Sequence, residues 1–244
     1  LFNFFNTIFY LKYDIKKFYI YIIIMLKLNY FNGKGIAETS RMLLAAAGVE
    51  YEDFRYPLDI NNWATYDFTR DEFDKDKADG KLWKSMDKLP FLQVDGKTIF
   101  QSKAIERYIA NRYLLMGGDL EDGAIIDSYC ECLRDFKTAY HAEKKKENKE
   151  EAMNKWFTEL LVNKLEVLDS IISNKGTNLD GYAVGGKLSL ADVSIYTFLV
   201  EYFDNKEGVL KAYENCPKLK AIVKTVGENE KIKHWIETRP VGSY

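Results

Sequence analysis

The fold is decided by residues 27–41, which read KLNYFNGKGIAETSR. The first residues predict a short strand, the glycines a turn, and the following residues a helix that ends at Gly48. Tyr30 falls where the strand ends, just before the helix N-terminus, where unpaired backbone N–H groups and the helix dipole favour negative charge. We therefore predict that the Tyr30 hydroxyl donates a hydrogen bond to an anion bound there, and packing is the competing interpretation.

The residues that follow predict the rest of a small α/β domain. Residues 51–56 (YEDFRY) alternate as a second strand, and residues 59–84 are polar and poorly periodic, which indicates a long loop with room for one helical turn. Residues 89–100 contain Asp-Gly between two short apolar runs, a pattern typical of a tight hairpin. Ser102 then suits the N-cap of another helix. This order of elements predicts a thioredoxin-like domain over residues 25–113.

The second half of the chain has a helical pattern. Residues 114–122 contain adjacent glycines and predict a linker. Apolar residues recur at three- and four-residue steps over residues 123–240, which predicts an all-α domain. Within it, Ser189 and Asp192 have the spacing of a capping box, so we interpret Asp192 as structural.

Composition narrows the classes of function. The chain has 244 residues, 47% of them hydrophobic and 30% charged, with a net charge of −2, which favours a soluble globular protein and gives no sign of a nucleic-acid partner. The three cysteines, Cys130, Cys132 and Cys216, suggest neither a disulfide framework nor a zinc site, so we expect a reducing, cytoplasmic environment. With only two histidines, we expect no metal cofactor.

Residues 1–24 differ from the rest. They consist almost wholly of Phe, Ile, Tyr, Asn, Lys and Leu, and Met25 follows them directly. We interpret this leader as translated upstream sequence. A membrane anchor and a signal peptide are the alternatives, but the apolar run 18–26 is short of the ~20 residues that span a bilayer. No small-residue cleavage site follows this run. From Met25 onward we expect no membrane segment.

Four motifs together resemble the glutathione S-transferase family: YFNxxGxAE at 30–38, KLP at 88–90, VDG at 94–96 and QSxAIxRY at 101–108. The closest resemblance is to the sigma-type branch, which includes glutathione-dependent prostaglandin D synthases. It implies a cytoplasmic homodimer that conjugates the glutathione thiolate to small apolar electrophiles in detoxification. Two alternatives remain: a non-catalytic ligand-binding or structural relative, and a glutathione-dependent isomerase or peroxidase.

The resemblance also implies a role for each site residue. Tyr30 would stabilise the thiolate of glutathione, and the glutathione-binding residues would be Trp63, Lys88, Leu89, Pro90, Gln101, Ser102 and Asp135, with Trp83 as the alternative to Trp63. Asp135 would reach from one subunit into the site of the other. The electrophile pocket would be shaped by Ile36, Tyr129, Leu133, Phe136 and Tyr140.

Two residues depart from the family pattern. Ile36 stands where the family usually has an arginine near the tyrosine hydroxyl, and we predict weaker thiolate stabilisation because a nearby cation favours ionisation of the thiol. His141 stands where the prostaglandin synthases carry a tryptophan, which counts against isomerase activity.

Overall fold

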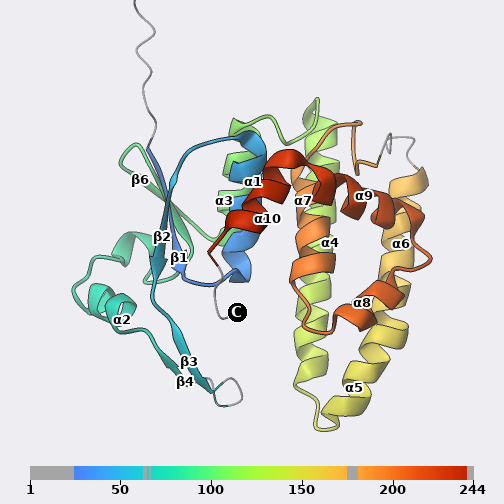
Figure 1. The fold of residues 1–244 in the computed structure, drawn as a ribbon, viewed down its shortest axis with the longest axis horizontal. Helices are drawn as coiled ribbons and strands as arrows, with labels where there is room; N and C mark the ends of the chain where they lie inside the picture. Colours follow the sequence, from blue (N-terminus) through green and yellow to red (C-terminus); the bar gives the residue numbers. More distant parts are fainter. Residues whose placement is uncertain (1–24, 63–64, 66, 175–180, 241–244) are drawn as a thin grey trace, which may run out of the picture.

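The structure is a computed structural model that describes residues 25–62, 65, 67–174 and 181–240. The leader 1–24 and Trp63 lie outside the described residues, so the interpretations placed on them stay predictions. Figure 1 shows a sheet domain beside a larger group of helices, with α1 and α3 between the sheet and the rest of the helices. The predicted fold class, a thioredoxin-like domain followed by an all-α domain, is confirmed.

The first domain is built on a four-stranded sheet with the order β2-β1-β5-β6. Its strands are β1 (Leu26–Phe31), β2 (Glu52–Tyr56), β5 (Phe91–Val94) and β6 (Lys97–Phe100). β1 runs parallel to β2 and antiparallel to β5, and the β5–β6 pair is the predicted hairpin. A short turn of helix, η2 (Gly35–Ala37), leads into α1 (Glu38–Ala47), and α3 (Ser102–Arg112) follows β6. Both α1 and α3 pack on the sheet face formed by Leu26, Leu28 and Leu92.

Residues 59–84 are more structured than the sequence predicted. They contain a second hairpin and two helical segments: β3 (Asp59–Asn62), β4 (Asp67–Thr69), α2 (Asp71–Ala78) and η3 (Trp83–Ser85). The β3–β4 hairpin buries no side chain among its described residues, and α2 buries only Phe73. Because elements with so little buried surface need no apolar periodicity, the sequence carried no pattern from which to predict them.

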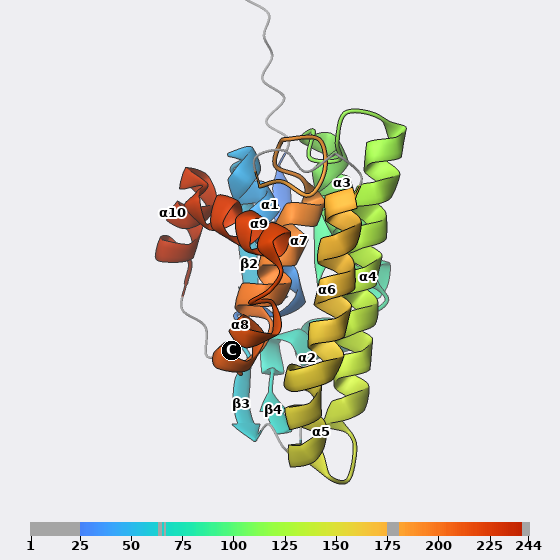
Figure 2. The same cartoon turned by 90° about the vertical axis from the view of Figure 1, so that its right-hand side faces the viewer.

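The second domain consists of helices in the part of the chain that the structure describes. They are α4 (Leu120–Lys144), α5 (Lys149–Lys155), η4 (Trp156–Leu160), α6 (Leu161–Asn174), α7 (Leu190–Tyr196), η5 (Thr197–Glu201), α8 (Lys206–Ala212), α9 (Pro217–Glu228) and α10 (Glu230–Thr238). Figure 2 shows α4 and α6 side by side along the length of the domain. α4 begins at Leu120, inside the predicted linker. Every residue of α7 is buried, and this helix packs against α4, α9 and α1.

The predicted capping box starts α7. The backbone N–H and the hydroxyl of Ser189 both donate to Asp192 Oδ2, at 2.7 and 2.6 Å, and the Ala183 N–H donates to Oδ1 at 2.6 Å. Burial raises the pKa of Asp192 to about 6, and these hydrogen bonds act against that rise. The structural role of Asp192 is confirmed.

Candidate active site

Tyr30 is the next-to-last residue of β1, just before the glycine turn that leads to α1. Its hydroxyl oxygen accepts a hydrogen bond from the Ile36 N–H at 3.4 Å. Gly35 makes this approach possible, because its φ is +43° and a Cβ there would lie 2.4 Å from the Tyr30 hydroxyl oxygen. Among the described residues the Tyr30 hydroxyl has no acceptor for its own proton. The hydroxyl can therefore still donate one hydrogen bond to a bound group.

The electrostatic surroundings keep Tyr30 protonated. Burial raises the pKa of Tyr30, while the Ile36 N–H and the Arg41 guanidinium lower it in part. The Arg41 guanidinium carbon lies 5.8 Å from the Tyr30 ring centroid. A phenol with a raised pKa is a hydrogen-bond donor near neutral pH and not a base.

The register of the sheet brings three predicted site residues together at one end of its strands. Asn29 pairs with Phe91, and Phe91 pairs with Phe100. Tyr30 follows Asn29, Pro90 precedes Phe91 and Gln101 follows Phe100. Because the paired strands are antiparallel, these three residues lie at the same end of the sheet. The sequence motifs that lie 60 and more residues apart thus meet at the end of β1.

The backbone geometry at this end of the strands is unusual at two residues. The Leu89–Pro90 peptide bond is cis, and Pro90 is buried. Gln101 has φ 74° and ψ 118°, a backbone conformation that costs a non-glycine residue about 1–3 kcal/mol and that is found most often at functional sites. Ser102 follows as the first residue of α3 and is half-buried, so it lies at a helix N-terminus of the kind that binds anions.

The remaining predicted residues lie in different surroundings. Lys88 and Asp135 are exposed, and Phe136 is half-buried with its ring 6.2 Å from that of Phe198. Three predicted pocket residues are instead buried in the core of the helical domain: Tyr129, Leu133 and Tyr140. Trp83 lies against the outer face of the sheet, opposite α1 and α3.

Ile36 is 51% exposed beside the Tyr30 hydroxyl, and its apolar side chain supplies no cation at the position where the resemblance implies an arginine. Lys34 does not replace it, because its ammonium is paired with Glu201 Oε2 at 2.9 Å. Among the cations in the described residues, Arg41 is the one that acts on the pKa of Tyr30.

The sequence did not reveal how the helical domain meets this turn. Besides the Lys34–Glu201 pair, Thr197 of η5 shares a hydrogen bond of 3.1 Å with Thr39 of α1. Next to Glu201, the Tyr202 hydroxyl lies 2.8 Å from Nε2 of His141. η5 therefore contacts both α1 and the turn after Tyr30, and together with Tyr202 it forms a wall of the helical domain.

Lys137 belongs to the same wall. Its ammonium lies 4.6 Å from the centre of the Tyr202 ring, and burial lowers the pKa of Lys137 to about 8. In the sequence, Glu201 stands inside the apolar run 198–203 (FLVEYF), whereas Lys137 lies among other charged residues and gives no such signal.

Comparison with known proteins decides the family. Residues 26–111 match the N-terminal domain of glutathione S-transferases, and residues 132–239 match their C-terminal domain. The chain belongs to the glutathione S-transferase family. It is 31% identical to glutathione S-transferase A3 of Mus musculus over 212 residues, which cover 86% of this chain and 87% of that protein. The curated relatives support a glutathione transferase.

Two solved structures show how similar the transferase is to its relatives. Monomeric Na-GST-3, a glutathione S-transferase from the hookworm Necator americanus, is 29% identical, with a TM-score of 0.70 over 90% of this chain and 100% of that chain. Prostaglandin synthase D of Nilaparvata lugens is 26% identical, with a TM-score of 0.68 over 89% of this chain and 100% of that chain.

Two further searches covered the described part of this transferase. None of the helices there is long and apolar enough to cross a membrane. No group of three or more His, Cys, Asp or Glu side chains there could hold a metal ion.

Proposed function

We propose that this transferase conjugates glutathione to small apolar electrophiles and that Tyr30 stabilises the reacting thiolate. The observation that carries the proposal is the Tyr30 hydroxyl, which accepts the Ile36 N–H and keeps its own proton available. A free thiol has a pKa of about 8.5, and lowering it by one unit needs about 1.4 kcal/mol. A hydrogen bond to a charged partner contributes about 1.5–3 kcal/mol, which is enough for one to two units.

The residues at this end of the strands support a specific placement of glutathione. The γ-glutamyl carboxylate would bind at Gln101 and Ser102, where the N–H groups and dipole of α3 favour an anion. The backbone of Leu89, next to Pro90, would hold the cysteinyl part in extended form. The exposed ammonium of Lys88 would pair with the glycine carboxylate.

Several finer features belong to the same proposal. Trp63 would add a contact to glutathione, and Asp135 would reach the site of a second subunit in a homodimer. The electrophile would lie between Ile36 on one side and Phe136 and η5 on the other. Tyr129, Leu133 and Tyr140 would support these residues from the core. We further propose a sigma-type enzyme with a cytoplasmic role in detoxification.

The test of this proposal is the variant Tyr30→Phe, assayed with 1-chloro-2,4-dinitrobenzene. Loss of a charge-assisted hydrogen bond of about 1.5–3 kcal/mol predicts a fall in kcat/KM of about 10- to 100-fold. The apparent pKa in the pH–rate profile should rise by about one to two units, because the thiolate loses its donor. Glutathione affinity, measured by calorimetry near pH 6, should change little.

Equal rates for wild type and Tyr30→Phe would show that Tyr30 does not activate the thiol. The second candidate function, a non-catalytic ligand carrier, would then be preferred. The exposed Ile36 beside the Tyr30 hydroxyl is the observation that favours it.

A second variant, Ile36→Arg, tests the missing cation. A guanidinium placed there should favour the thiolate by about 1 kcal/mol, the value for two unit charges about 4 Å apart in water, and raise the rate at pH 6.5 about fivefold. Ile36→Gln is the matched control, since it is polar and uncharged and should leave the rate within about twofold. An Ile36→Arg rate equal to that of Ile36→Gln would mean that Arg41 already supplies the cation that the reaction needs.

A further inference from the structure

The outer face of the sheet, opposite α1 and α3, is only partly covered. Leu92 and Ile99 point into the main core, so their neighbours Gln93 and Thr98, which pair across β5 and β6, point to the outer face. At one end of this face a small second core is formed by Tyr56, Phe73, Leu82 and Phe91. Beside this core, a hollow of about 390 Å³ remains open, and Leu82 and Phe91 line it as well.

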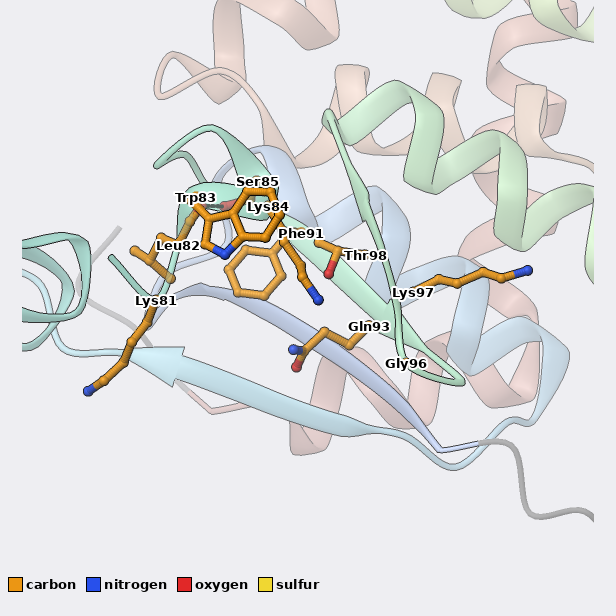
Figure 3. A pocket seen from close by; sticks show the side chains of 10 residues that line it. All are labelled: Lys81, Leu82, Trp83, Lys84, Ser85, Phe91, Gln93, Gly96, Lys97 and Thr98. Carbon is orange, nitrogen blue, oxygen red and sulfur yellow. Dashed lines mark hydrogen bonds between the residues drawn. The ribbon is translucent and has the colours of Figure 1, made fainter. Parts of the chain in front are cut away.

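The hollow has an aromatic wall and an aromatic floor. Trp83, from η3, is 68% exposed and forms the wall, while Phe91, from β5, is 6% exposed and forms the floor. Figure 3 shows both rings at the same side of the hollow. A large aromatic side chain that remains so exposed beside a concavity is typical of a binding surface.

The charged groups around the hollow are all cationic. Lysines 81, 84 and 97 line it, and no acidic side chain is among the described residues that do so. Figure 3 shows Lys84 directed toward the space between Gln93 and Thr98, whereas Lys81 and Lys97 point away from it. Lys81 is in any case neutralised, because its ammonium lies 2.6 Å from Asp76 and 3.3 Å from Asp79.

Lys84 differs from Lys81 in having no carboxylate partner. Its ammonium lies 5.8 Å from the Trp83 ring centroid, and no ion pair of Lys84 occurs within the part of the chain that the structure describes. The hollow therefore combines an apolar aromatic surface with an amide, a hydroxyl and one cation, Lys84, that is directed into it without a carboxylate partner among the described residues.

We propose that this hollow is a second binding site, separate from the Tyr30 site, for a small planar aromatic carboxylate. The ring of the ligand packs against Trp83 and Phe91, and its carboxylate pairs with the Lys84 ammonium and accepts from the Thr98 hydroxyl. The volume of about 390 Å³ fits such a ligand, since small-molecule sites begin near 300 Å³. The site does not depend on the proposed transferase reaction, because neither Tyr30 nor Gln101 nor Ser102 lines the hollow.

The test is equilibrium dialysis of the full chain against 2-naphthoate, with saturating S-hexylglutathione present to occupy the Tyr30 site. We expect saturable binding of one 2-naphthoate per chain that S-hexylglutathione does not displace. Trp83→Ala should weaken it at least about fivefold, because stacking on an aromatic side chain contributes about 1–3 kcal/mol. Lys84→Ala should weaken it about threefold or more, as expected for loss of a surface ion pair.

Two controls make the test specific. Lys97→Ala removes a lysine of the same hollow that points away from it, and should leave the affinity within about 1.5-fold because its charge is remote and screened by salt. The neutral amide 2-naphthamide should bind more weakly than 2-naphthoate to wild type and equally to wild type and Lys84→Ala. Displacement by S-hexylglutathione would overturn the proposal, as would a Kd unchanged in Trp83→Ala or the absence of saturable binding.

Discussion

Replacing Asp192 with alanine should lower the free energy of unfolding by about 4 kcal/mol, since two buried backbone donors lose their acceptor at about 1–3 kcal/mol each. The donors are the N–H groups of Ala183 and Ser189, and both Asp192 and Ser189 are 0% exposed, so water cannot replace the carboxylate. The loss falls on α7, which packs against α4, α9 and α1 and so joins both domains. Urea unfolding followed by circular dichroism measures the change.

Two milder variants separate the carboxylate from the hydroxyl. Asp192→Asn keeps an oxygen for the Ala183 N–H but turns an amide donor toward the Ser189 N–H, so it should destabilise the protein by an intermediate amount. Ser189→Ala removes one hydroxyl and should cost about 1 kcal/mol, the usual cost of losing an N-cap side chain. If Asp192→Ala cost no more than Ser189→Ala, the carboxylate would not be what stabilises the start of α7.

The features that the sequence predicted well are those written in local patterns. The Asp95-Gly96 hairpin, the Ser189–Asp192 capping box and the glycine turn after Tyr30 each depend on residues only a few positions apart. Turn and cap chemistry acts over a few residues, so a local pattern is sufficient to predict it. The order of these local elements along the chain then predicted the thioredoxin-like domain.

The features that were missed depend on contacts between distant parts of the chain. Lys34 and Glu201 are 167 positions apart, and the Glu38–Arg239 hydrogen bond joins residues 201 positions apart. Helical periodicity identified the apolar face of α4 but not what it faces. Tyr129 and Tyr140, which the resemblance implied for a pocket, are buried in the core. Periodicity shows that a face is apolar and leaves its partner open.

Arg41 connects the stability of the first domain with the geometry of Tyr30. It is 0% exposed, and its guanidinium donates to the carbonyl oxygens of Phe31 at 3.4 Å and Gly33 at 2.6 Å. Phe31 is the last residue of β1, and Gly33 lies in the turn that follows it. The same guanidinium donates to Asp53 Oδ1 at 3.1 Å and lies 3.5 Å from Glu38 Oε2. One side chain thus holds the turn, β2 and α1 together.

Arg41→Met should therefore lower the free energy of unfolding by about 3–5 kcal/mol, the usual cost of removing one partner from a buried charge cluster. Its apolar side chain fills part of the space but leaves the Gly33 carbonyl and a share of the Glu38 and Asp53 charge without a donor. Loss of the cation should also raise the pKa of Tyr30 further, because Arg41 acts to lower it. A phenol with a higher pKa is a weaker hydrogen-bond donor to the thiolate, so the apparent pKa of the thiol should rise as well. Urea unfolding measures the loss of stability, and the pH–rate profile measures the shift in the thiol pKa.

Arg41→Lys is the matched control for this prediction. It keeps the charge but cannot reproduce the planar fork that serves Phe31, Gly33 and Asp53 at once. We expect it to restore most of the shift in the pH–rate profile and less than half of the lost stability, because the first depends on charge and the second on geometry. If Arg41→Lys restored stability completely, charge alone would hold the turn, and the position of Tyr30 would not depend on the hydrogen bonds of the guanidinium.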